Sequence, residues 1–218
     1  MPQTIAFFDM DHTVLRDSSG VLYMRFLRSR GQVSSWSLLR SYWYALLYKV
    51  GMFDYPAVAV KLAQTAFDQD EAETRALCQR FFDELMVHYV ADKAVQRIDE
   101  HRARGHLVTL ITASTPYVAG PVAAHLGIEE YLCTRMEVVD GRFTGRVRLP
   151  PCYGAHKVDY AQAFAAQHEG DLAGAYFYSD SLSDLPLLEA VGHPVAVNPD
   201  PRLKRLAGVR GWQIENWH

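Results

Sequence analysis

Two aspartates separated by one residue follow the first apolar run of the chain. The run from Thr4 to Phe8 is rich in β-branched and aromatic residues and predicts a buried strand, and Asp9 and Asp11 stand where that strand should end. Ligands of open α/β sheets bind at this carboxyl edge. Two carboxylates this close repel each other, whereas a divalent cation would remove the repulsion and make one of them useful as a nucleophile. The alternative interpretation is a strand followed by a solvated, Asp-rich turn.

A second polar stretch follows a second strand-like run. Residues 107–111 have the pattern of a buried strand, Thr112 comes directly after them, and Pro116 stands where a helix would begin. A hydroxyl group at the end of a strand, followed by backbone N–H groups at a helix start such as those near Ala113 and Ser114, can cradle a phosphate. Ordinary helix capping by Ser and Thr is the alternative.

A lysine and a second acidic cluster complete the set. Lys157 lies at the start of a predicted helix, and the strand-like run 175–178 leads into Asp180 and Asp184. A single lysine is usually a surface residue, so Lys157 is a candidate only because it precedes this cluster. Strand ends that bring several carboxylates together need a cation, and ligation by oxygen alone favours Mg²⁺.

The stretch between the first aspartates and residue 91 has a different character. It shows helical periodicity throughout and no convincing strand, which predicts a helical insertion that folds over the strand edge as a cap. An aromatic helix around Trp43 could lie on a membrane surface, because Arg40 and Lys49 flank it. Its basic residues are too few for that role, and packing in the core of a helical bundle is the favoured interpretation.

Beyond residue 91, strand and helix patterns alternate. We therefore predict an α/β fold with a Rossmann-like, three-layer α/β/α core and a parallel sheet, formed by residues 1–15 and 91–218. Residues 16–90 form the inserted α-helical cap. Residues 136–147 contain two strand-like runs around Asp-Gly and predict a β-hairpin flap.

Composition narrows the classes of function. The chain has 218 residues and a formal net charge of −3, which gives no electrostatic footprint for nucleic acid. No stretch approaches the roughly 20 apolar residues of a membrane span, and the amino terminus lacks the pattern of a cleaved signal segment. Cys78, Cys133 and Cys152 are odd in number and widely spaced, as in reduced thiols. We expect a cytoplasmic monomer or homodimer that acts on a small molecule and binds neither nucleic acid nor membrane.

Taken together, the polar groups resemble the four motifs of the haloacid dehalogenase superfamily, in the form with a second aspartate that its phosphatases use. The resemblance extends over nearly the whole chain and is closest to the phosphoserine-phosphatase-like subgroup. The matching residues are Asp9-Met10-Asp11-His12-Thr13 for the first motif, Thr112 for the second, Lys157 for the third, and Asp180 and Asp184 for the fourth.

This resemblance, together with the chemistry of the residues, implies a phosphatase mechanism. Asp9 attacks phosphorus and becomes an aspartyl-phosphate, while Asp11 acts first as general acid and then as general base. Asp9, the backbone carbonyl of Asp11, and Asp180 bind Mg²⁺, and Asp184 supports Lys157 or a metal-bound water. The residues expected to hold the phosphate or substrate near the reacting centre are Thr112, Ala113, Ser114, Lys157 and Ser183.

The substrate is expected to be a small amino-alcohol phosphate. Phosphoserine phosphatases usually carry a glutamate where this chain has Ser18, and their cap arginine has no clear counterpart here. Histidinol-phosphate phosphatases also occur among relatives with aromatic caps. Histidinol phosphate has an amine and an imidazole but no carboxylate, which suits Asp17, Tyr23 and Trp43. We expect histidinol phosphate, with phosphoserine as the alternative.

Two other classes of protein remain as alternatives. A signalling receiver domain also combines acids, Mg²⁺, a Thr and a Lys, but receivers lack the long helical insertion and the Asp-x-Asp spacing. A non-catalytic phosphate-binding protein would keep its function without either carboxylate of the first motif.

Overall fold

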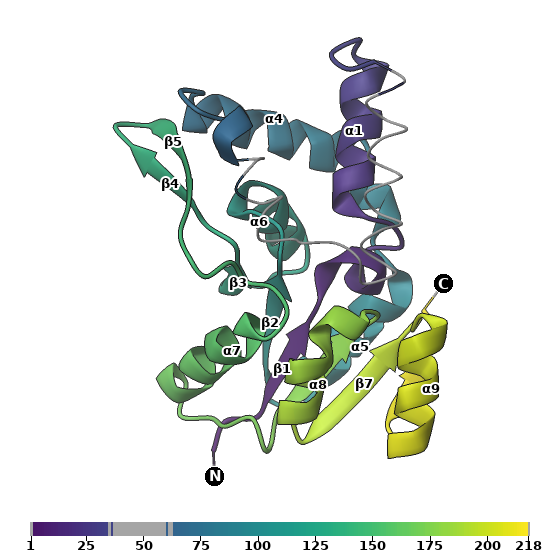
Figure 1. The fold of residues 1–218 in the computed structure, drawn as a ribbon. Helices are drawn as coiled ribbons and strands as arrows, with labels where there is room; N and C mark the ends of the chain where they lie inside the picture. Colours follow the sequence, from purple (N-terminus) through teal and green to yellow (C-terminus); the bar gives the residue numbers. More distant parts are fainter. Residues whose placement is uncertain (1, 35, 37–59, 61–62, 218) are drawn as a thin grey trace.

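A parallel sheet forms the centre of the chain, in a computed structural model that describes residues 2–34, 36, 60 and 63–217 (Figure 1). Within that part of the chain the sheet has six strands, which pair in the order β3-β2-β1-β6-β7-β8 with every pairing parallel. The strands are β1 (Ile5–Phe8), β2 (Leu107–Thr112), β3 (Tyr131–Cys133), β6 (Tyr176–Ser179), β7 (His193–Val197) and β8 (Gln213–Glu215).

Helices cover both faces of the sheet. Because successive side chains of a strand point to opposite faces, Ala6 and Phe8 of β1 join one apolar cluster, and Ile5 and Phe7 join the other. On the side of Phe8 lie α5 (Asp92–Ala103) and α6 (Pro116–His125), and on the side of Phe7 lie α7 (His156–Gln167), α8 (Leu185–Ala190) and α9 (Pro201–Arg210). The predicted three-layer α/β/α core is confirmed.

The described helices of the predicted insertion lie at the same end of the molecule as the predicted hairpin (Figure 1). The backbone N–H of Glu71 donates to Gly141 O at 2.9 Å, and the N–H of Asp68 donates to Phe143 O at 2.9 Å. These bonds tie the start of α4 to the hairpin. The elements are α1 (Ser19–Ser29), α4 (Glu71–Glu84), a 3₁₀ turn (Met86–Tyr89), β4 (Met136–Val139) and β5 (Arg142–Val147).

The two ends of the insertion meet. Leu15 and Val90 form an antiparallel bridge, and the N–H of Ala91 donates to Val14 O at 2.9 Å. This pairing supports a division of the chain into residues 1–15 and 91–218 as the core and 16–90 as the cap, which we keep as a proposal.

Two short strands were not predicted. β3 and β8 lie at the two edges of the sheet and have three residues each. Their residues are mostly half-exposed or exposed, so neither stretch has the continuous apolar run of a central parallel strand. The segment after residue 211 provides the last strand and a buried Trp217.

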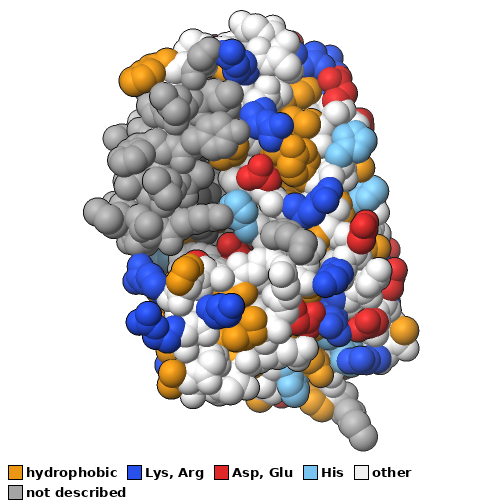
Figure 2. All heavy atoms as spheres, turned by 90° about the vertical axis from the view of Figure 1, so that its right-hand side faces the viewer, with side chains coloured by type: hydrophobic (Ala, Val, Ile, Leu, Met, Phe, Trp, Pro, Cys, Tyr) orange, Lys and Arg blue, Asp and Glu red, His pale blue; other side chains and the backbone are white. Residues whose placement is uncertain are grey.

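Three further features concern the cysteines, membrane-spanning helices and the charges on the surface. Cys78, Cys133 and Cys152 are buried and free. Among the described residues, no helix combines the length and the apolar character that a membrane crossing requires. On the face shown in Figure 2, Lys and Arg side chains are interspersed with Asp and Glu.

A buried histidine of α5 contacts strand β6. His101 of α5 is 1% exposed, and its Nε2 lies 2.9 Å from the hydroxyl oxygen of Tyr178. Its Nδ1 lies 2.8 Å from Nδ1 of His106. Burial, with a smaller effect from His106 and nearby arginines, lowers the pKa of His101 to about 4. Between these two pKa values, His101 is therefore neutral in the folded chain and protonated in the unfolded chain.

This difference predicts a loss of stability in mild acid. Between pH 6.5 and about 4 the unfolded state binds more protons than the folded state, so the free energy of unfolding should fall as the pH is lowered. His101→Gln should flatten this fall by roughly 2 kcal/mol in urea unfolding measured at several pH values. The control is His125→Gln, at an exposed histidine. An equal change in both variants would contradict burial of His101 as the cause.

Candidate active site

A buried lysine joins two carboxylates at the carboxyl edge of the sheet. Lys157, in the first turn of α7, is 1% exposed, and its Nζ donates to Asp9 Oδ1 at 2.7 Å and to Asp184 Oδ2 at 2.8 Å. Asp9 directly follows β1, and Asp184 ends a short 3₁₀ turn after β6. Lys157 is therefore a buried residue, not the surface lysine that its residue type suggested.

Asp184 has one oxygen without a partner. Its Oδ2 also accepts a hydrogen bond from Ser179 Oγ at 2.8 Å, whereas its buried Oδ1 has no hydrogen-bond partner. Buried polar atoms are nearly always paired, so such an atom marks a place for a water or an ion.

Burial changes the acidity of Asp9. Removal from water raises the pKa of its carboxyl to about 7, with smaller upward contributions from Asp184 and Asp11, while the Lys157 ammonium opposes the rise. The Lys157 ammonium therefore offsets only part of the effect of burial on this carboxyl. A further positive charge would favour the carboxylate form that a nucleophile needs.

Asp11 points to different partners from Asp9. Residues 10–14 form a wide helical turn in which Asp11 is extended and His12 is left-handed, with φ 56° and ψ 1°. The turn carries the Asp11 carboxylate to the start of α1, where it accepts hydrogen bonds from Ser19 N at 2.9 Å and Ser19 Oγ at 3.1 Å. Burial raises the pKa of Asp11 to about 6, and the bonds from Ser19 oppose that rise.

The Thr112 loop lies beside this turn. Phe8 of β1 pairs with Leu110 of β2, so Thr112 comes out at the same edge of the sheet as the aspartates. Thr112 is buried, and its Oγ1 accepts a hydrogen bond from Ser114 N at 3.1 Å. Thr115 stands at the N-cap position of α6, but its side chain makes no capping bond. Thr115 therefore does not cap this helix through its hydroxyl group. Ala113 lies between these groups.

Asp180 and Ser183 lie on the other neighbouring strand end. Asp9 N donates to Tyr178 O at 2.9 Å, which places the residues after β6 beside Asp9. Asp180 follows β6 directly and is partly exposed. Ser183 Oγ lies 2.8 Å from Ser181 Oγ, within the 3₁₀ turn that carries Asp184.

Three residues were predicted to contact the part of the substrate beyond the phosphate, and they have different surroundings. Asp17 is close enough to Asp11 to raise its pKa, and it lies 3.9 Å from the Arg25 guanidinium. Tyr23 packs between α1 and α4, with its ring 5.2 Å from that of Phe81. Trp43 lies outside the described residues.

Sequence reasoning missed the serine residues that hold the acids. Ser19 binds Asp11, and Ser179 binds Asp184. A signal for Ser19 was present, because Ser18 and Ser19 precede an apolar-periodic stretch as N-terminal helix residues do. Nothing in the sequence alone indicates that this helix start faces a carboxylate eight residues earlier.

The residues fit a hard divalent cation through the chemistry of their donors. Among the described residues, no three His, Cys, Asp or Glu side chains converge as a metal cluster. The predicted set needs only two carboxylates and one backbone carbonyl, all oxygen donors of the kind Mg²⁺ takes. The unpartnered Asp184 Oδ1 and the raised pKa of Asp9 both agree with a cation and its waters at this edge.

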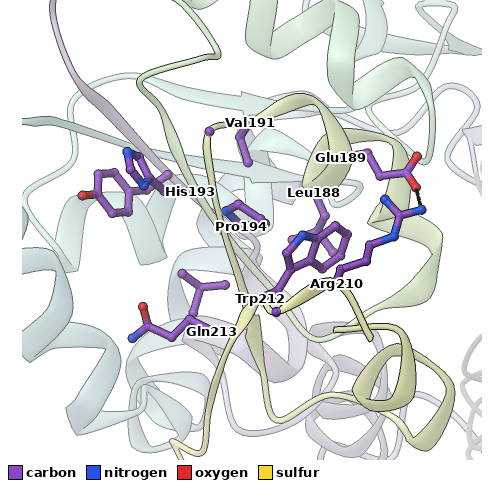
Figure 3. A pocket seen from close by; sticks show the side chains of 12 residues that line it. Leu188, Glu189, Val191, His193, Pro194, Arg210, Trp212 and Gln213 are labelled. Atoms are coloured by element: carbon purple, nitrogen blue, oxygen red, sulfur yellow. Dashed lines mark ion pairs between the residues drawn. The ribbon is translucent and has the colours of Figure 1, made fainter. Parts of the chain in front are cut away.

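A separate cleft of about 500 Å³ lies at the opposite end of the sheet (Figure 3). His193, Trp212 and Arg210 line it, and Arg210 pairs with Glu189 at 2.5 Å. It surrounds the amino end of β7, whereas the aspartates follow the carboxyl ends of β1 and β6. This cleft is therefore not the site described above.

The fold and the site together define a hydrolase of the haloacid dehalogenase type. A family model described as haloacid dehalogenase-like hydrolase matches residues 6–189, and the chain belongs to this family. Within it, the chain is a phosphatase of the phosphoserine-phosphatase-like group.

Three individual similarities accompany the family match. The chain is 36% identical to a phosphoserine phosphatase of Mycobacterium tuberculosis over 218 residues, which are 97% of this chain and 70% of that protein. It is 28% identical to a histidinol-phosphatase of Neisseria meningitidis serogroup C, over 99% of both chains. A crystal structure of a protein of unknown function from Bordetella pertussis Tohama I matches over 100% of both chains, with a TM-score of 0.87 and 31% identity.

The lysine contacts predict a large effect on stability. Lys157→Met would leave Asp9 and Asp184 buried without their shared cation, which typically costs about 3 kcal/mol or more. We expect that loss in urea unfolding of the metal-free chain above pH 7. Lys204→Met, at an exposed lysine of α9, should change the unfolding free energy by less than about 0.5 kcal/mol. Similar values for the two variants would show that the ionic contacts do not stabilise the fold.

Proposed function

We propose that this phosphatase hydrolyses a small phosphate monoester through a phosphorylated Asp9. The observation that carries the proposal is the buried contact of Lys157 with Asp9 and Asp184, beside a second carboxyl whose pKa is raised to about 6. Phosphoryl transfer needs a nucleophile, a fixed positive charge such as the Lys157 ammonium, and an acid with an intermediate pKa.

The first half of the reaction phosphorylates the protein. An oxygen of Asp9 forms a bond to phosphorus as the bond from phosphorus to the alcohol oxygen breaks, and Asp11 gives its proton to that oxygen. Lys157, the Thr112 hydroxyl and the amides of Ala113 and Ser114 stabilise the phosphoryl oxygens. Ser183 belongs to the same proposed substrate-binding set.

The second half releases phosphate. Asp11, now ionised, takes a proton from water as the water oxygen attacks phosphorus and the bond to Asp9 breaks. Both roles require Asp11 to exchange its bonds with Ser19 for the reacting groups, and a pKa near 6 suits both proton transfers at neutral pH.

Magnesium is the proposed cofactor. Its ligands would be Asp9, the backbone carbonyl of Asp11, and Asp180. When bound, Mg²⁺ neutralises the charge of the phosphate and of the nucleophile, so that the two can approach. Asp184 is proposed to hold Lys157, with its second oxygen available to a bound water.

Histidinol phosphate is the proposed substrate. Asp17 lies near Asp11, where its carboxylate could bind the substrate's ammonium group. The similarity to the Neisseria histidinol-phosphatase covers both chains almost completely. Tyr23 and Trp43 remain the proposed aromatic contacts for the imidazole.

Phosphoserine is the second candidate. The Arg25 guanidinium lies 3.9 Å from Asp17, so this pair could recognise the carboxylate and ammonium of an amino acid together. The higher identity to the mycobacterial phosphoserine phosphatase also favours it.

Substitution of the two acids should separate their roles. With Mg²⁺ present, Asp9→Asn should abolish the phosphorylated intermediate and turnover of every ester. Asp11→Asn should slow release of an alkyl alcohol in the first turnover by about 10²–10⁴-fold, because that alcohol needs a proton. Release of p-nitrophenolate, which leaves without one, should slow much less. Unchanged activity in Asp9→Asn would contradict the mechanism and favour a non-catalytic binding role.

A panel of phosphate esters tests the substrate. We expect kcat/KM for histidinol phosphate to exceed those for phosphoserine, phosphoethanolamine and sugar phosphates by at least about tenfold, the effect of one good polar contact. Asp17→Asn should remove this preference and spare p-nitrophenyl phosphate. A preference for phosphoserine would support the second candidate, and equal weak rates on all esters would contradict both.

A further inference from the structure

Asn198 joins the turn that carries Asp11 to the last residues of the chain. It directly follows β7, and its side-chain Nδ2 donates a hydrogen bond to His12 O at 3.1 Å. On its other side, Oδ1 accepts a hydrogen bond from Trp217 N at 2.7 Å, and its backbone N–H donates to Glu215 O at 2.9 Å. One amide group therefore contacts two segments that are far apart in the sequence.

The contacted turn has an unfavourable backbone. His12 adopts a left-handed conformation, and Asp11 before it is extended, so that the Asp11 carboxylate contacts Ser19 while Asp9 contacts Lys157. A left-handed non-glycine residue persists when its surroundings hold it there. Asn198 donates to the carbonyl of this very residue. Asn198 is itself left-handed, with φ 45°, a conformation that asparagine tolerates better than most residues.

The other end of the contact is anchored in the core. The Trp217 indole is 4% exposed and lies 5.5 Å from the Tyr178 ring, and its Nε1 donates to Glu215 Oε2 at 2.7 Å. Glu215 in turn accepts two hydrogen bonds from Arg97 of α5, at 2.8 and 2.9 Å. Asn198 is thus attached to a rigid set of side chains on the side away from the turn.

We propose that Asn198 is a positioning residue: through the carbonyl of His12 it holds the turn that aims Asp11, and it braces that turn against the carboxy-terminal segment. It does not touch the reacting groups. The inference rests on the proposed role of Asp11 as general acid. It adds a residue outside the four motifs, and it gives the end of the chain a part in the reaction.

The test compares two leaving groups in the first turnover with Mg²⁺ present. Asn198→Gly keeps the left-handed backbone and removes both side-chain bonds, whereas Asn198→Asp keeps an acceptor for Trp217 and removes the donor to His12. Both variants should release an alkyl alcohol about 10- to 100-fold more slowly than the unmodified chain, the effect of a displaced proton donor. Release of p-nitrophenolate should change less than about threefold.

The matched control is Asn216→Gly, at an exposed asparagine two residues from the end of the chain, which should release both alcohols at unchanged rates. Equal slowing of the two leaving groups in the Asn198 variants would overturn the proposal and indicate a general structural loss. An unchanged alkyl rate in Asn198→Asp would overturn the route through His12.

The outcome is separable from that of the proposed function. If Asp11→Asn shows the leaving-group effect and the Asn198 variants do not, only this inference fails. If Asp11→Asn shows none, the general-acid role itself is wrong.

Discussion

The ammonium of Lys157 is the contact on which the site depends. It is shared between Asp9 and Asp184, all three side chains are almost fully buried, and the partners come from points 148 and 27 residues away in the sequence. Buried charges that lack partners are strongly destabilising. The folded chain therefore keeps β1, α7 and the turn after β6 in one arrangement, or it loses the compensation for those charges.

The same constraint explains why a cation suits this edge. Lys157 supplies one positive charge to a region that receives Asp9, Asp11, Asp180 and Asp184, and the pKa of Asp9 remains raised despite the ammonium. In the proposed reaction, a metal ion completes the charge balance when the substrate adds further negative charge.

The turn at Met10–Val14 separates two chemically identical groups. On a continued strand, Asp9 and Asp11 would share one face and one environment. Instead, Asp9 stays at the end of β1 in contact with Lys157, and the turn with its left-handed His12 brings the Asp11 carboxylate to Ser19 at the start of α1. Asp9, the proposed nucleophile, is thereby held by Lys157, and Asp11 is held by Ser19 at the start of α1. The contact between Ser19 and Asp11 links the insertion to the proposed proton donor. The two ends of the insertion also meet, at the bridge between Leu15 and Val90.

Local patterns in the sequence predicted most of the fold. Four of the six sheet strands lie in short, mainly apolar runs, and the Asp-Gly hairpin and the helix at His156 have short-range signals that depend on neighbours in the chain. The edge strands β3 and β8 could not be predicted in this way, because their residues are short, partly exposed, and ordered mainly by pairing with strands already in the sheet.

The residue types of the site were also evident from the sequence, since acids, a hydroxyl group and a lysine at successive strand and helix ends indicate phosphate chemistry. Only the tertiary structure decided which group contacts which. The shared Lys157, the attachment of Asp11 to Ser19 and the contact of Asn198 with His12 all join segments whose separation in the chain carries no information about distance. Hydrogen bonds and ion pairs act over a few ångströms, so these contacts exist only once packing has brought the segments together.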